Sequence, residues 1–153
     1  EKIDMGNQLS NNELMGDFTE VITLTFEDIQ STGTTATAFA TIPAGGGVDV
    51  AMVFEAEALA GATDITLDVG TTEGDPDEFI DALDVDAMSA PVANTGESFV
   101  QGAGNTTIEG GSLPVGLTQS DATVYYKFGG TVANLTAGKV VIGLRIFDLG
   151  RFA

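Results

Sequence analysis

Apolar and polar residues alternate with a period of two along most of the chain after residue 18. That period places successive side chains on opposite faces, so each alternating run predicts a half-buried β-strand. The runs are rich in Val, Ile, Thr, Tyr and Phe, which favour strands. We predict strands over six segments, which are 22–26, 34–42, 48–55, 65–69, 123–128 and 139–147.

The alternation also predicts which side chains share a face of each strand. In the segment 139–147 one face holds Val140, Ile142, Leu144 and Ile146. In the segment 48–55 one face holds Val48, Val50, Met52 and Phe54, and they alternate with Asp49, Ala51, Val53 and Glu55. Half-buried strands turn one such face toward the core.

Turn residues separate the predicted strands, as in the segment 43–47 and at the pairs 110–111, 129–130 and 137–138. Many short strands joined by glycine-rich turns indicate an all-β fold, either a β-sandwich or a jelly roll. At 153 residues the chain is expected to form one domain. We assign residues 17–153 to it and interpret the polar, irregular residues 1–16 as an extended N-terminal arm.

One segment departs from the period of two and predicts a short helix over about 76–83. Asp75 can cap it, Pro76 suits the first helical position, and Glu78 would complete a capping box. Phe79, Ile80 and Leu83 would give the helix an apolar face that closes one end of the sandwich.

The charge of the chain is strongly acidic and unevenly distributed. The formal net charge is −18, from 23 acidic and five basic side chains, and four of the five bases lie after residue 120. Such a chain lacks the clustered bases that phosphate contacts need, so we expect no nucleic acid partner. An acidic protein partner would have to meet the C-terminal segment. No apolar run approaches the ~20 residues of a membrane helix, so we expect no membrane partner.

The composition lacks residues on which several kinds of catalytic and metal-binding chemistry depend. The chain has no Cys and no His, which removes thiolate chemistry, the commonest general base and the usual zinc ligands. We therefore expect no enzyme, no catalytic residues and no cofactor. The acidic segment 75–86 raises a calcium hypothesis through Asp75, Asp77 and Asp81. It lacks the spacing of a calcium loop, so a solvated acidic surface is the preferred interpretation.

Aromatic and basic residues come together near the C-terminus. The residues that we predict to bind a partner are Lys127, Lys139, Arg145, Arg151, Tyr125 and Phe147. Aromatic anchors with arginine are typical of protein interfaces. The alternative is that the rings belong to the core and the bases extend past them to solvent.

Two segments resemble small virion structural proteins of tailed phages. The run 64–86, DITLDVGTTEGDPDEFIDALDVD, is similar to a strand that ends in Val-Gly, followed by a polar turn with Asp and a hydrophobic step. The run 136–147, TAGKVVIGLRIF, resembles their closing strand. Together these runs cover about a quarter of the chain, and they carry no catalytic residues.

The resemblance implies a capsid decoration protein, also called a cement protein. Such a protein would bind the major capsid protein on the outer surface of the head, commonly as a homotrimer, and would stabilise the shell across subunit boundaries. Two alternatives stay open. One is another virion component, such as the base of a head fibre or a tail protein. The other is a calcium-dependent carbohydrate-binding module of an extracellular protein.

Overall fold

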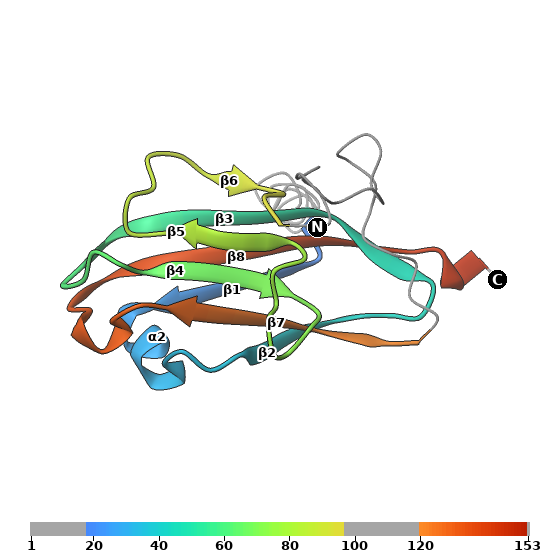
Figure 1. The fold of residues 1–153 in the computed structure, drawn as a ribbon. Helices are drawn as coiled ribbons and strands as arrows, with labels where there is room; N and C mark the ends of the chain where they lie inside the picture. Colours follow the sequence, from blue (N-terminus) through green and yellow to red (C-terminus); the bar gives the residue numbers. More distant parts are fainter. Residues whose placement is uncertain (1–17, 97–119, 153) are drawn as a thin grey trace, which may run out of the picture.

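The structure is a computed structural model, and it describes residues 18–96 and 120–152. Figure 1 shows long strands stacked in two layers, with one short helix at one end. The elements in chain order are β1 (Glu20–Thr25), α2 (Phe26–Thr32), β2 (Thr37–Ile42), β3 (Gly46–Ala60), β4 (Thr66–Gly70), β5 (Ile80–Asp84), β6 (Val92–Ala93), β7 (Ala122–Gly129), η1 (Val132–Asn134), β8 (Ala137–Asp148) and η2 (Gly150–Phe152).

The eight strands form two antiparallel four-stranded sheets. Sheet A has the order β1-β8-β3-β6, and sheet B has the order β2-β7-β4-β5. The strands pair as first with last, β1 with β8, β2 with β7, β3 with β6 and β4 with β5. This nested pairing is that of one long hairpin rolled into a two-layer barrel, which is a jelly roll. The predicted all-β sandwich or jelly roll is therefore confirmed.

The core lies between the two sheets and takes side chains from both. Sheet A contributes the predicted face of β8, where Val140, Ile142 and Leu144 are fully buried. Sheet B contributes rings that contact one another, since Tyr126 lies 5.8 Å from both Phe39 and Phe128 between ring centroids. Tyr126 and Phe128 are therefore core residues.

The prediction of a short helix over about 76–83 is wrong, because this segment is a loop followed by a strand. Residues 80–84 form strand β5, because Phe79 N–H donates to the Val69 carbonyl and Ile80 pairs with Val69 across sheet B. Both apolar side chains become fully buried, which outweighs the local helix signals. Glu78 does not complete a capping box, and its carboxylate accepts hydrogen bonds from Thr71 N–H, at 2.8 Å, and from the Thr72 hydroxyl.

The α-helix of the described residues is α2, which directly follows β1 and begins at Phe26, the last residue of the strand predicted over 22–26. Thr25 and Asp28 form a capping box, in which each side chain accepts a hydrogen bond from the other residue's backbone N–H. Phe26 therefore begins a helix and does not end a strand. Ile29 anchors the helix, since its side chain is fully buried.

A β-bulge in β3 reverses the predicted faces of that strand. Val48 lies opposite Ile146 and Val50 lies opposite Arg145, so Asp49 is an extra residue in β3. Beyond the bulge, Ala51 and Val53 point into the core, where both are fully buried. Val50, Met52 and Phe54, which share the predicted face with Val48, therefore lie on the outer face of sheet A.

No helix among the described residues is long and apolar enough to cross a membrane. The predicted N-terminal arm, residues 1–16, lies outside the described residues.

Candidate functional site

The structure divides five of the six predicted partner-binding residues between the two faces of the jelly roll and places the sixth beyond the end of β8. Lys139, Arg145 and Phe147 belong to β8 and lie on the outer face of sheet A, opposite the buried face of that strand. Tyr125 and Lys127 belong to β7 and lie on the outer face of sheet B. Arg151 is exposed on η2, after the end of β8. These six residues therefore do not form one continuous patch.

Three of the bases interact within the chain. The Lys139 ammonium lies 2.6 Å from a Glu57 carboxylate oxygen, and Arg145 Nε lies 2.9 Å from an Asp49 carboxylate oxygen. Lys127 Nζ donates to the Gly74 carbonyl at 3.2 Å. All these groups are partly exposed, so the two ion pairs contribute little to stability. An acidic partner would have to compete with Glu57 and Asp49 for the bases of sheet A.

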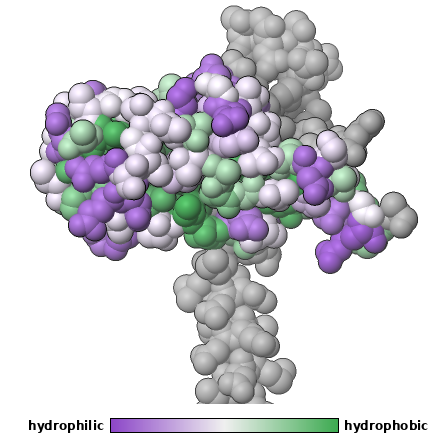
Figure 2. Space-filling model, turned by 90° about the horizontal axis from the view of Figure 1, so that it is seen from below, coloured by the Kyte–Doolittle hydropathy of each residue, from purple (hydrophilic) through white to green (hydrophobic). Residues whose placement is uncertain are grey.

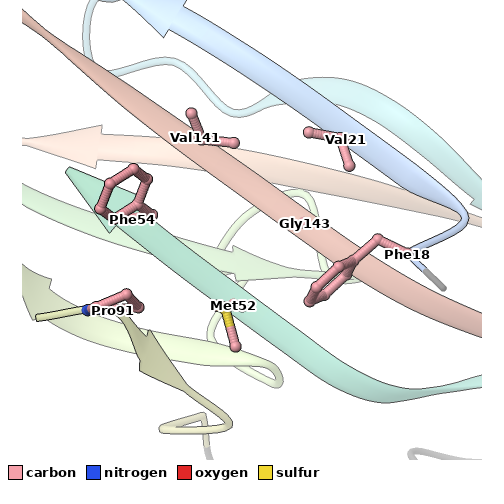
Figure 3. A pocket seen from close by; sticks show the side chains of 7 residues that line it. All are labelled: Phe18, Val21, Met52, Phe54, Pro91, Val141 and Gly143. Carbon is pink, nitrogen blue, oxygen red and sulfur yellow. The ribbon is translucent and has the colours of Figure 1, made fainter. Parts of the chain in front are cut away.

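The outer face of sheet A carries an apolar groove of about 340 Å³. We call it the outer groove. Figure 3 shows the side chains that line it, which come from β1, β8 and β3 and from the residues beside β1 and β6. They are Phe18, Val21, Met52, Phe54, Pro91, Val141 and Gly143. Phe54 is 45% exposed and Val21 is 39% exposed, so apolar side chains lie open to solvent here.

Phe18 lies at one end of the outer groove, and Gly143 makes room for it. A Cβ atom on Gly143 would lie 3.0 Å from Cδ1 of the Phe18 ring. The next residue, Thr19, is tied to β8, because its N–H donates to the Leu144 carbonyl at 2.9 Å and its hydroxyl accepts from Ile146 N–H at 2.9 Å. The chain therefore reaches the groove directly after residue 17.

The two ion pairs lie at opposite ends of the outer groove. Along β3 and β8, Met52 is paired with Gly143 and Phe54 with Val141 in the middle of the sheet. Glu57 pairs with Lys139 beyond one end of these positions, and Arg145 meets Asp49 at the bulge beyond the other end. Among the described residues, two acids and two bases thus lie at the two ends of the groove along β3 and β8. An apolar centre with a polar border is the arrangement of protein interfaces.

The surface seen from below is mixed in character. Figure 2 shows green apolar areas there that are small and lie among purple and white polar residues. Mixed surfaces of this kind are ordinary for a face in water.

The acidic residues around β5 do not form a metal site in the described part of the chain. Asp75 and Asp77 lie in the loop before β5, and Asp81 lies in the strand. No group of three or more acidic side chains in residues 18–96 and 120–152 is arranged to hold a metal ion. Asp68 instead has a structural role, since its carboxylate accepts a hydrogen bond from Ala82 N–H at 2.6 Å. Burial raises the pKa of Asp68, and the nearby Asp81 carboxylate raises it further.

The outer groove was not predicted from the sequence, although the apolar run 50–54 is a signal of it. The segment 50–54 is apolar at every position, and a half-buried strand needs only alternate apolar residues. A strand that is apolar on both faces is typical of sheets that are covered on both sides. Pro91 and Phe18 carry no such signal, because only the fold brings them to this face.

Comparison with known proteins gives one structural likeness. No protein-family model matches the chain, and a search of curated proteins finds no match. Among solved structures, a chain of the capsid asymmetric unit of cyanophage Pam1 has a similar fold, with a TM-score of 0.54. The likeness covers 82% of this chain and 79% of that chain, at 18% sequence identity. At this identity the likeness shows a shared fold.

Proposed function

We propose that the chain is a structural protein of a phage virion, and that it decorates the outer surface of the capsid as a cement protein. The observation that carries the proposal is the likeness to a chain of a cyanophage capsid asymmetric unit, which extends over 82% of this chain. The resemblance of residues 64–86 and 136–147 to small virion proteins supports the same role. In this proposal the partner is the major capsid protein, and the chain acts as a homotrimer.

The surface chemistry supports an adhesive role for the chain. The outer groove offers open apolar side chains with an ion pair at each end among the described residues, while the whole chain carries a net charge of −18. An acidic exterior keeps decorated particles apart in solution, and an apolar groove provides area for a contact between protein chains, including copies of this one. No catalytic residues are needed for this function, and we propose none.

The mechanism we propose is stabilisation by binding across subunit boundaries. A protein that binds the assembled shell, and not its separated subunits, shifts the equilibrium toward the assembled state. Many copies on a symmetric lattice add their effects, so a modest affinity for each copy is sufficient.

The experiment is co-sedimentation with shells of the phage that carries the gene, prepared without this protein. We expect saturable binding of the full chain to intact shells, and little binding to separated capsid subunits. Shells that bind the chain should also withstand a higher temperature before they open. Absence of binding to the shell, or binding to tails or head fibres, would contradict the decoration role.

A further inference from the structure

We infer that the outer groove is the acceptor for residues 1–17 of a second copy of this chain. This inference rests on the proposed homo-oligomer and names the surface that would build it. It starts from three features, which are an open apolar groove, the point at which the described chain begins, and the charges around that groove.

The described chain begins beside the outer groove. Phe18 lines the outer groove, and Thr19 is hydrogen-bonded to β8 at Leu144 and Ile146. Traced backward from Glu20, the chain therefore runs toward the Arg145 end of β8 and away from Val141 and Phe54. To fill its own groove the segment would have to reverse direction at Phe18. A segment from another copy meets no such constraint, because it can approach from the Phe54 end.

Residues 1–17 have side chains that suit an apolar groove, and they are long enough to reach another copy. Residues 1–17 contain five apolar side chains of the size that an apolar groove accommodates, Ile3, Met5, Leu9, Leu14 and Met15. Seventeen extended residues span up to about 55 Å, which is long enough to reach a neighbouring subunit. Burying such side chains would remove from water the exposed apolar surface of Phe54 and Val21.

The charges of residues 1–17 also favour the groove over other surfaces of the molecule. The segment 1–17 has one base and four acids, so most of this acidic molecule repels it. The two ends of the outer groove along β3 and β8 differ from this, because among the described residues Lys139 and Arg145 lie there beside Glu57 and Asp49. The segment would therefore meet less repulsion at the groove than on the rest of an acidic surface.

The geometry also gives a type of assembly. Each copy has one donor segment and one acceptor groove, and these are different surfaces. Such heterologous contacts form closed rings when the rotation between copies closes. The inference is therefore compatible with the proposed trimer, whereas a face-to-face pairing of two grooves would stop at a dimer.

Cysteine cross-linking tests this inference directly, because the chain has no native cysteine. The donor variant is Leu14→Cys and the acceptor variant is Phe54→Cys, at a residue that is 45% exposed. The control acceptor is Thr123→Cys, at an exposed position of β7 on the other sheet. The full-length donor variant carries a tag and is mixed with each full-length acceptor variant under mild oxidation, without shells.

We expect a covalent heterodimer of the donor with Phe54→Cys, at about tenfold or more the yield obtained with Thr123→Cys. A docked segment holds the two thiols at an effective concentration far above that of the mixed proteins, which is the reason for the difference. Equal yields with the two acceptors would overturn the inference. The same holds if a chain with both Leu14→Cys and Phe54→Cys forms only an intrachain link.

The outcome is separate from that of the proposed function. Shell binding by the unmodified chain together with equal cross-linking yields would retain the decoration role and remove this assignment. Specific cross-linking without shell binding would retain the groove assignment and remove the decoration role.

Discussion

The ring of Phe18 lies against Gly143, and a Cβ atom at position 143 would stand 3.0 Å from Cδ1 of that ring. This contact ties the first described residue to the centre of sheet A, on the face that carries the outer groove. It also distinguishes Gly143 from Gly138, the other glycine of β8, where a Cβ atom would meet the backbone of Ala58 and Leu59 as well as the Leu59 side chain.

Two glycine variants in β8 should therefore differ in stability. Gly143→Ala needs only a small shift of the Phe18 ring, so we expect a cost of less than about 1 kcal/mol. Gly138 has a φ of +121°, and a Cβ there would lie 2.7 Å from Leu59 Cα. We expect Gly138→Ala to cost roughly 2 kcal/mol or more. Urea unfolding of both variants measures the difference, and equal costs would contradict the contacts described.

Asn94 should be important for the bulge in β3. Its side-chain oxygen accepts from Ala51 N–H at 2.8 Å, its amide donates to the Asp49 carbonyl at 3.3 Å, and its φ is 56°. We expect Asn94→Ala to cost about 2 kcal/mol, because a partly buried N–H loses its partner and alanine disfavours this φ. Asn94→Gly is the control, since glycine accepts this φ, and it should be less destabilised by about 1 kcal/mol. A smaller loss for Asn94→Ala than for Asn94→Gly would be inconsistent with this account.

The pKa of Asp68 predicts a pH dependence of stability. Burial raises its pKa in the folded chain above the ordinary value of about 3.9. The stability that the neutral carboxyl provides is therefore present below that value and lost as pH rises through the raised pKa. Asp68→Asn cannot ionise and keeps an oxygen for Ala82 N–H. We expect this variant to gain stability relative to the parent chain between pH 3 and pH 7, measured by thermal unfolding.

Asp64 is the control, because its pKa is shifted in the opposite direction to that of Asp68. Hydrogen bonds from the Thr131 hydroxyl and N–H lower its pKa, so its ionised form stabilises the fold above about pH 3.9. That contribution disappears as pH falls through the lowered pKa. Asp64→Asn should therefore be less stable than the parent chain at pH 7, with the difference closing toward low pH. Parallel pH profiles for the two variants would show that these assignments are incorrect.

The basic residues of the C-terminal segment give a prediction on shell binding. We expect charge reversal of Arg145 and Arg151 together to weaken co-sedimentation with shells. Arg145→Glu also breaks the pair with Asp49, so Arg151→Glu alone is the cleaner variant. Arg151 is exposed on η2, and its replacement should leave the unfolding temperature unchanged. If the double variant binds shells as fully as the parent chain does, the capsid-facing surface does not include these residues.

The period of two was sufficient to predict the fold class and the buried face of β8, because alternation acts locally along a strand. It could not predict the bulge at Asp49, which appears only in the register of β3 against β8, almost a hundred residues away in the chain. The helix expected after Asp75 was wrong for the same reason, since Phe79 and Ile80 gain more from sheet B than from a local helix. The outer groove needed the fold, because residues from distant segments meet only there.

Imaging of shells with and without the chain tests the central claim most directly, which is that this protein acts by binding a capsid lattice. Electron microscopy of shells incubated with the full chain should show added density at regular positions on the outer surface, and the density should be large enough for the jelly roll. Shells that look the same with and without the chain, at protein concentrations that leave the chain folded, would contradict the account.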